Sequence, residues 1–285
     1  MRTIFKNSAH QEQYNRDGFI RYPLLSSQEI ADLLTVYNEL NSGLEGNKFY
    51  TSHTSGDVAY KTKVDQAIKA VLVPKLGDIF EDYKPVFGFY LVKSQGSETL
   101  DLHLDWQFVD ERQYVGFNMW CPLVDVNKEN GALFAIPGSH KHIKILRGYN
   151  TPNPMWYVDG KVDESQVQTL PLKAGEALVF DLRLVHGAWP NTLPQQRIAI
   201  GMVAIPQEAD ILHFWAEKEA RDHRDIEVYK MQPEYYMLNH NGQRPPAESL
   251  IGHWDDTLRE QTIADLKKAY TQKPSFIKRL FGALG

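Results

Sequence analysis

The chain has 285 residues, 42% hydrophobic and 24% charged, so it is long enough to bury a sizeable core. A formal net charge of −5 shows no basic excess and argues against a nucleic-acid partner. The one cysteine, Cys121, excludes an intramolecular disulfide and fits a reducing compartment. No run approaches the ~20 apolar residues that span a bilayer, and the first residues do not resemble a signal peptide. We therefore expect a cytoplasmic protein without a membrane partner, either a monomer or a homodimer.

The first predicted elements are helices. Residues 27–40 carry apolar side chains on one helical face, and Ser26 and Glu29 have the spacing of a capping box. A second helix is predicted over residues 64–82. Together they define an N-terminal helical part, residues 1–83.

From residue 84 the pattern becomes β. Short runs rich in β-branched and aromatic residues alternate with Gly, Asn and Pro as far as residue 206, which is typical of a sandwich or barrel. Residues 146–168 interrupt this core and form either an active-site lid or a solvated excursion. After Pro206 the pattern turns helical again, so residues 207–285 are predicted to be a C-terminal helical extension of a single domain, residues 1–285.

The segment Thr99 to Phe108 alternates apolar and polar residues. The alternation predicts that His103 and Asp105 project from one face of a strand, two residues apart, where both can reach one metal ion. In a later apolar run, residues 176–190, His186 comes just before a glycine and is predicted to end a strand pointing inward. Two imidazoles and one carboxylate form the facial triad of non-haem Fe(II) oxygenases, which leaves three coordination positions open.

Arg197 follows in the next strand-like run, on a face shared with small residues. A guanidinium binds a carboxylate through two parallel hydrogen bonds, which suits the distal carboxylate of 2-oxoglutarate. A second His-x-Asp, His223 to Asp225, serves as a comparison. It lies in a charged, helix-like stretch and is interpreted as a solvated face.

These motifs resemble the phytanoyl-CoA dioxygenase family of Fe(II)/2-oxoglutarate oxygenases. The resemblance extends over residues 13–206. It rests on Y-N-R-D-G-F-I at 14–20, H-L-D at 103–105, N-G-A-L-F-A-I-P-G-S-H-K at 130–141 and H-G-A-W-P-N at 186–191, followed by the arginine. It implies a double-stranded β-helix (jelly-roll, cupin-like) core with flanking helices. The cofactors it implies are Fe(II), 2-oxoglutarate and O2.

The resemblance also implies contacts between 2-oxoglutarate and Trp120, and weaker ones with Phe89 and a lysine such as Lys63. The family often has serine where this chain has Ala188, and Asn191 or Thr192 is expected to supply the missing bond. Related halogenases replace the acidic ligand with a small residue. Asp105 is present, so hydroxylation or another oxidation is favoured over halogenation.

The substrate is expected to be a small molecule. Candidate contacts are Arg112, Arg147, Tyr149, Trp156 and Trp189. Two alternatives stay open: a jelly-roll protein that binds a small ligand or metal without turnover, and a cupin-type hydrolase or isomerase that does not use 2-oxoglutarate.

Overall fold

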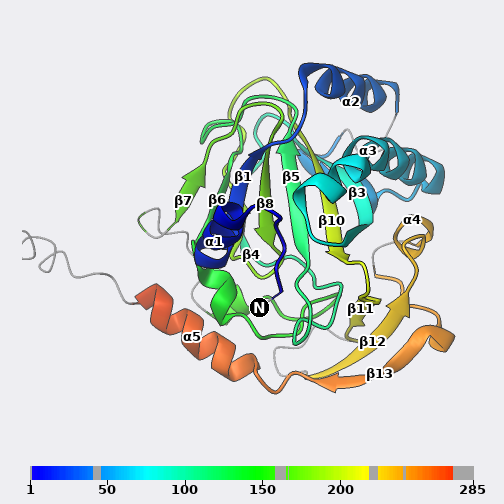
Figure 1. Ribbon diagram of the computed structural model, residues 1–285, viewed down its shortest axis with the longest axis vertical. Coiled ribbons are helices and arrows are strands. Elements are labelled where there is room, and N and C mark those ends of the chain that lie inside the picture. The colour runs from blue at the N-terminus through cyan, green and yellow to red at the C-terminus, as the bar shows by residue number, and fades with distance from the viewer. Residues whose placement is uncertain are drawn as a thin grey trace, which may run out of the picture.

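The computed structural model describes residues 2–40, 46–157, 165, 167–217, 224–239 and 242–271 (Figure 1). Its core is two antiparallel sheets. The larger has the order β1 (Phe19–Pro23), β8 (Glu176–Asp181), β5 (Phe117–Pro122), β10 (Arg197–Pro206), β3 (Tyr83–Lys93) and β2 (Phe49–Thr51). The smaller has the order β4 (Leu100–His103), β9 (His186–Ala188), β6 (Leu133–Ala135) and β7 (Gln168–Leu170). This pair of sheets confirms the predicted jelly roll.

Helices cover the outer face of the larger sheet. They are α1 (Ser8–Asp17), α2 (Ser27–Glu39) and α3 (Val58–Ile79), and the 3-10 turn η1 (Ser52–Thr54) lies between β2 and α3. The capping box of α2 is confirmed, because Ser26 Oγ accepts from the Glu29 amide while the Glu29 carboxylate accepts from the Ser26 amide. The second helix begins at Val58 instead of Val64, because Asp57 caps it by accepting from the Tyr60 amide at 3.0 Å.

The N-terminal part is not only helical. Strand β1 lies at one edge of the larger sheet and pairs with β8, and β2 lies at the other edge and pairs with β3. Residues 1–83 are therefore built into the jelly roll. The sequence did not reveal β1 because its five residues alternate too briefly to distinguish a strand from a loop.

The prediction that residues 207–285 form a helical extension is wrong for part of the described segment. The chain forms a third sheet of β11 (Ile211–Trp215), β12 (Asp225–Met231) and β13 (Leu250–Asp255), below the core in Figure 1. All five residues of β11 are buried, which a one-sided amphipathic helix cannot achieve. Among the described residues of this segment, the short α4 (Tyr235–Leu238), the turn η4 (Ala247–Ser249) and α5 (Arg259–Thr271) are helical.

The last helix is confirmed. In α5, Leu266 is buried in the apolar cluster between the two core sheets, and the helix contacts the 3-10 turns η2 (Ser139–His142) and η3 (Pro154–Tyr157). Within the described ranges, no helix is both long and apolar enough to cross a lipid bilayer. The basic segment after residue 271 lies outside the described residues.

The interruption after β6 is only partly described, since residues 158–164 and 166 lie outside the described ranges. Its first part runs along β11. The Tyr149 amide donates to the Phe214 carbonyl, and the Ala216 amide donates to the Tyr149 carbonyl, both at 2.9 Å. That part is therefore hydrogen-bonded to the third sheet. The choice between an active-site lid and a solvated excursion stays a prediction.

Candidate active site

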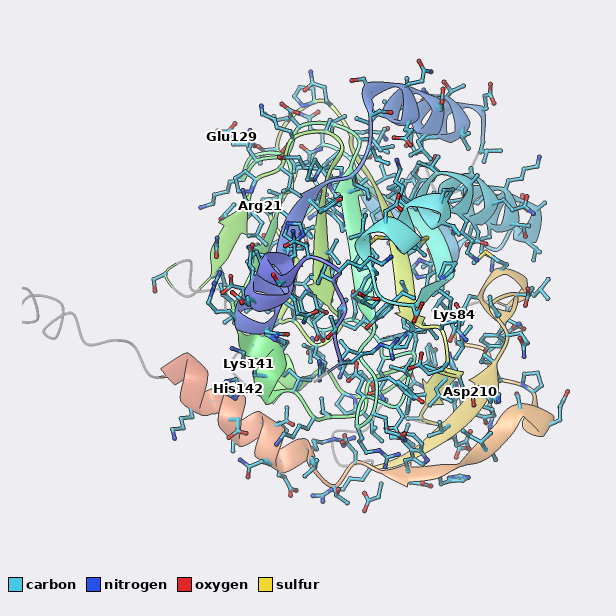
Figure 2. The ribbon with its side chains drawn as sticks, viewed as in Figure 1. Arg21, Lys84, Glu129, Lys141, His142 and Asp210 are labelled. Carbon is cyan, nitrogen blue, oxygen red and sulfur yellow. The ribbon has the colours of Figure 1, made fainter. Side chains whose placement is uncertain are left out.

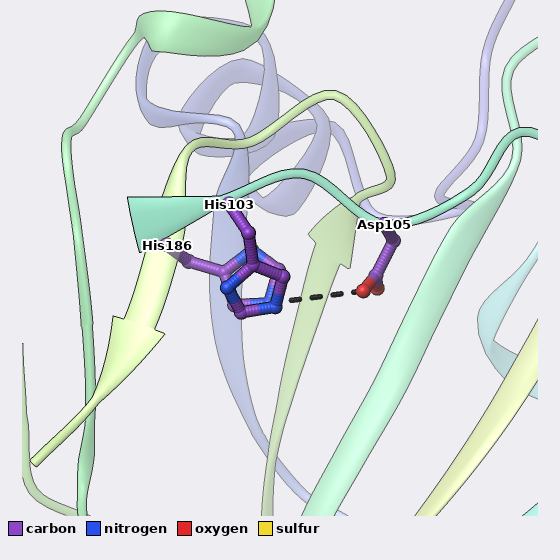
Figure 3. Close-up of side chains that lie close together, drawn as sticks. All are labelled: His103, Asp105 and His186. Atoms are coloured by element: carbon purple, nitrogen blue, oxygen red, sulfur yellow. Dashed lines mark ion pairs between the residues drawn. The ribbon is translucent and has the colours of Figure 1, made fainter. Parts of the chain in front are cut away.

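Two histidines face each other across the smaller sheet. His103, the last residue of β4, pairs in register with His186, the first residue of β9. Residues opposite each other on antiparallel strands bring their Cβ atoms within ~5.5 Å, and here the ring centroids are 4.3 Å apart. Asp105 Oδ1 lies 3.9 Å from His186 Nε2, and the possible ligand atoms of the three residues lie within 4.8 Å of one another (Figure 3). The arrangement can hold one metal ion.

The backbone reaches this arrangement by a different route from the one the alternation predicted. Strand β4 ends at His103, so Asp105 lies in the following loop. His186 does not end β8 but begins β9. The chain leaves the larger sheet at Asp181, whose side chain accepts from the Arg183 amide at 2.9 Å and whose carbonyl accepts from the Leu184 amide at 2.8 Å. This turn transfers His186 to the smaller sheet, opposite His103.

Hydrogen bonds orient the metal-binding atoms. The Nδ1 atoms of His103 and His186 lie 2.8 and 2.9 Å from the carbonyl oxygens of Asp101 and Leu184. A carbonyl only accepts, so each Nδ1 carries the proton and each Nε2 keeps its lone pair for a metal. Burial, reinforced by the neighbouring His186, lowers the pKa of His103 to about 4 against the opposing effect of Asp105, so this ring is neutral at pH 7.

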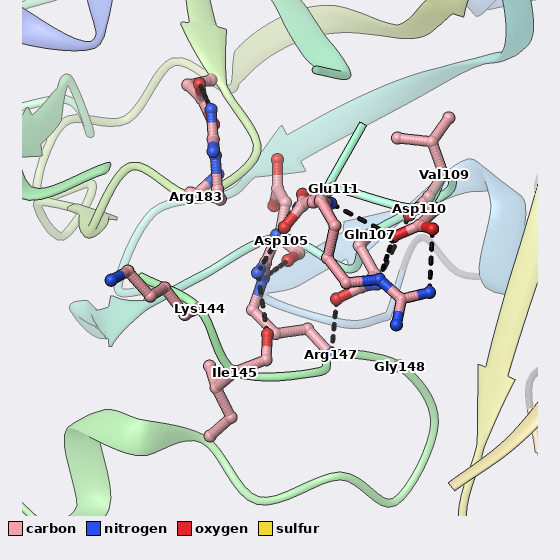
Figure 4. Close-up of polar contacts among 12 residues, drawn as sticks. Asp105, Gln107, Val109, Asp110, Glu111, Lys144, Ile145, Arg147, Gly148 and Arg183 are labelled. Carbon is pink, nitrogen blue, oxygen red and sulfur yellow. Dashed lines mark hydrogen bonds and ion pairs between the residues drawn. The ribbon is translucent and has the colours of Figure 1, made fainter. Parts of the chain in front are cut away.

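Arg147 braces the loop that carries Asp105 (Figure 4). Its Nε donates to the Asp105 carbonyl at 2.9 Å, and its two terminal nitrogens donate to the Glu111 carboxylate at 2.9 and 2.6 Å. The Arg147 backbone amide also donates to the Gln107 side-chain oxygen, and the Gln107 backbone amide donates to the Arg147 carbonyl. Its guanidinium is thus engaged within the protein, so the structure gives Arg147 a positioning role instead of the predicted substrate contact.

A residue of the larger sheet also donates a hydrogen bond to the carboxylate of Asp105. Asn118, on β5, donates its side-chain amide to Asp105 Oδ2 at 3.1 Å, while its own Oδ1 is buried without a partner among the described residues. The sequence did not single out Asn118. The only available signal was a polar residue in an otherwise apolar run.

Arg197, the first residue of β10, is 1% exposed and lines the same cavity as the triad. One terminal nitrogen donates to the Leu91 carbonyl at 3.2 Å, and its Nε has no partner among the described residues. Burial lowers the pKa of Arg197 to about 9, so it is still protonated at pH 7. A buried cation without a counter-ion is costly, and an anionic ligand removes that cost.

Trp120 lies beside this cation. The Arg197 Cζ is 5.3 Å from the centroid of the Trp120 ring, and the buried indole Nε1 has no partner among the described residues. Both side chains line one cavity, and each carries a buried N–H group without a partner among the described residues. This fits the carboxylate of a co-substrate whose other end reaches the triad.

A second buried cation lies next to Arg197 and was missed by the sequence reasoning. Lys93 ends β3, pairs in register with Arg197 and is 0% exposed. Its ammonium donates to the carbonyls of Glu98 and Trp189 at 2.7 and 2.9 Å. Burial, with a smaller contribution from Arg197, lowers the pKa of Lys93 to about 7. In the sequence, the available signal for Lys93 was its place at the end of a largely apolar run.

The triad and Arg197 open into a cavity of about 320 Å³ between the two core sheets and the third sheet. Trp120 and Phe89, for which the family resemblance implied co-substrate contacts, also line it, and so does Ala188. A set of aromatic residues connected by ring contacts makes up another part of the lining, called the aromatic end below. The residues there are His53, Phe87, Phe89, Trp106, Phe108, His213, Tyr235 and Tyr236.

Several predicted co-substrate residues lie elsewhere. Lys63 is exposed on α3 and does not line the cavity. The Asn191 side chain donates to the Lys93 and Gln195 carbonyls, and Thr192 donates to a carbonyl on the surface. Neither therefore replaces the hydroxyl that Ala188 lacks.

The predicted substrate contacts are also not brought together. Arg112 pairs with Asp110, and its side chain is 68% exposed. The Trp189 indole donates to Thr169 at 3.0 Å. Neither of these, nor Tyr149, lines the cavity. The side chain of Trp156 and the comparison histidine at 223 lie outside the described residues.

Comparison with known proteins agrees with this geometry. The family model for phytanoyl-CoA dioxygenase matches residues 14–199. The phytanoyl-CoA dioxygenase domain-containing protein 1 homolog of Dictyostelium discoideum is 28% identical over 133 residues, which cover 44% of this chain and 47% of that protein. The chain thus aligns with about half the length of this curated relative.

Solved structures share the fold. The epimerase SnoN in complex with Fe3+, alpha ketoglutarate and nogalamycin RO has a TM-score of 0.54 and 19% identity, over 87% of this chain and 94% of that one. HygX from Streptomyces hygroscopicus, with nickel, 2-oxoglutarate and hygromycin B bound, has a TM-score of 0.51 and 14% identity, over 71% of this chain and 88% of that one. At these identities the likeness establishes the jelly-roll architecture.

Proposed function

The chain belongs to the phytanoyl-CoA dioxygenase family, and from that membership we propose that it is an Fe(II)- and 2-oxoglutarate-dependent oxygenase. It oxidises, most simply by hydroxylation, a C–H bond of a small molecule and releases succinate and CO2. The observation that supports this most directly is a buried Arg197, without a carboxylate partner among the described residues, in the same cavity as His103, Asp105 and His186.

Each group has a separate task in this proposal. The Nε2 atoms of His103 and His186 and the carboxylate of Asp105 hold the metal on one side. Arg197 binds the distal carboxylate of 2-oxoglutarate, which orients the 2-oxo acid end toward the triad. Bound iron supplies the oxidising chemistry together with 2-oxoglutarate and O2. The apolar walls of the cavity exclude water from the reacting atoms.

The test is a visible spectrum recorded without oxygen after Fe(II) and 2-oxoglutarate are added to the protein. We expect a weak charge-transfer band that disappears when glutarate, a diacid without the chelating oxo group, replaces 2-oxoglutarate. The band is also expected to be absent in His186→Ala and retained in His142→Ala, whose exposed side chain lies on the outside of the molecule (Figure 2).

Stoichiometric iron binding without a band in the wild-type protein would overturn the proposal. Such a result would favour a non-catalytic binding protein or a metal-dependent hydrolase or isomerase. Neither of those requires a carboxylate clamp beside the metal.

A further inference from the structure

The two ends of the cavity differ in charge. Among the described residues that line it, Asp105 and Arg197 carry the only fixed charges. In the proposed function both are committed, the carboxylate to the metal and the guanidinium to 2-oxoglutarate. No fixed charge on the described lining is therefore left to pair with a charged substrate. A buried ion without a partner binds poorly, because it loses its hydration without compensation.

Aromatic rings in mutual contact form the wall of the aromatic end. Phe87 lies at its centre, with ring centroids 5.0 Å from Tyr236 in a stacked pair, 5.4 Å from Phe89 and 5.6 Å from Phe108. Gly201 makes this arrangement possible, since a Cβ there would lie 2.6 Å from the Phe89 ring. Such a wall offers ring faces and edges to a flat apolar ligand.

His53 lies within this wall. Its ring centroid is 5.6 Å from that of Phe87 and 5.1 Å from that of Phe89, and its Nδ1 is buried without a partner among the described residues. Burial, with help from the nearby Lys61, lowers the pKa of His53 to about 4. The ring is therefore neutral at pH 7 and offers one N–H donor and one lone pair, which suit a hydroxyl or carbonyl group.

Other polar atoms of the cavity are also unpaired. The Tyr236 hydroxyl and Asn118 Oδ1 are buried without partners among the described residues, and both residues line the cavity. Asn118 uses its amide N–H on Asp105, so its oxygen is available to accept a proton donor close to the metal-binding residues. Buried polar atoms are nearly always hydrogen-bonded, which indicates that a ligand completes them.

Resting on the proposed function, we propose that the substrate is a small, uncharged ring compound that carries at least one hydroxyl or carbonyl group. The ring packs on Phe87 and Phe89, and His53 is the residue that selects for the polar group. The volume of about 320 Å³ must also accommodate 2-oxoglutarate, so the reacting part is small for a ligand site. It bears no phosphate, carboxylate or ammonium.

A matched series of probes tests the charge of the ligand. Calorimetric titrations are made anaerobically on the protein loaded with Fe(II) and 2-oxoglutarate. The probes are 2-naphthol, naphthalene-2-carboxylate, 2-naphthylmethylammonium and decanoyl-CoA. We expect 2-naphthol to bind at least about 30-fold more tightly than either naphthyl ion, because neither ion finds a counter-charge. This series needs no variant, so misfolding cannot obscure it.

A second comparison tests the role of His53. Wild-type protein is expected to bind 2-naphthol about 3- to 10-fold more tightly than naphthalene, which is the effect of one neutral hydrogen bond. His53→Phe should remove that preference while still binding naphthalene, since a phenyl ring fits between Phe87 and Phe89. His142→Phe, at an exposed position, should keep it.

Three results would overturn the inference: equal or tighter binding of a naphthyl ion, tighter binding of decanoyl-CoA, or no binding by any neutral probe. The charge-transfer band is recorded on the same samples to separate this inference from the proposed function. If the charge-transfer band is present but a naphthyl ion binds more tightly than 2-naphthol, only the proposed substrate class is wrong. If 2-naphthol is preferred but no charge-transfer band forms, the proposed oxygenase function is wrong, and the cavity is a binding site for neutral ring compounds.

Discussion

The metal-binding end of the cavity and its aromatic end differ in how their polar atoms are satisfied. At the first end, the outward atoms of His103 and His186 are bonded to carbonyls, and only the inward Nε2 atoms are left for a ligand. At the second end, His53 Nδ1 and the Tyr236 hydroxyl have no protein partner among the described residues. The two metal-binding histidines are oriented by the chain itself, whereas the unpaired polar atoms of the aromatic end depend on a ligand for completion.

The largest effect is expected where the protein braces the metal-binding loop. Arg147→Met should destabilise the fold by about 3–5 kcal/mol, because it leaves the Glu111 carboxylate buried without its partner. It should also weaken Fe(II) binding about 10- to 100-fold, since the Asp105 carbonyl loses its donor. Chemical denaturation and a competitive Fe(II) titration measure the two effects.

Two variants control for the loss of a cation. Arg112→Met breaks an exposed pair and should change stability by less than about 1 kcal/mol. Arg147→Met combined with Glu111→Leu should recover part of the lost stability but not the Fe(II) affinity. If Arg147→Met alone unfolds at the wild-type denaturant concentration, the bracing role is wrong.

The next effect concerns co-substrate binding. Arg197→Met should weaken 2-oxoglutarate binding by about 2–5 kcal/mol, because the distal carboxylate loses its charged partner. Titration of the charge-transfer band with 2-oxoglutarate gives the dissociation constant. Binding of 2-oxobutanoate, which lacks the distal carboxylate, should be the same in variant and wild type. An unchanged affinity for 2-oxoglutarate would remove Arg197 from the site.

A pH dependence is expected from Lys93. Its folded-state pKa of about 7 lies below the ordinary lysine value, so between these two values the unfolded chain binds more protons. The free energy of unfolding should therefore rise with pH from about 7 upward, by the order of 1–3 kcal/mol. Denaturation of wild type and Lys93→Met across this range measures it. A constant difference between the two proteins would contradict the predicted burial penalty.

The smallest effect is expected at Ala188. The side chain is buried and lines the cavity, where the family often has serine. Ala188→Ser should tighten 2-oxoglutarate binding by about 0.5–1.5 kcal/mol if the added hydroxyl reaches the carboxylate. Ala188→Val, which adds bulk without a donor, is the matched control. Equal effects of the two substitutions would show that this position acts only through its size.

Much of the site was readable from local sequence. His103, Asp105, His186 and Arg197, which the structure brings to one cavity, were singled out because their residue types and their settings in β-like runs indicated one chemistry. The capping box of α2 was equally local, since its two partners are three residues apart. Such features depend on neighbours along the chain, so the sequence is enough to identify them.

The other assignments depended on contacts between distant segments. Arg147 looked like a substrate contact until the fold placed it against Glu111, and β11 looked helical until its residues were buried on both faces. His53, on η1, became part of the cavity only because β3 packs beside it. The sequence by itself indicated the β core, and it singled out the residues on which the proposed reaction class and metal site rest. The tertiary structure alone decided which polar groups are satisfied and which await a ligand, because burial and hydrogen-bond partners arise from residues far apart in the chain.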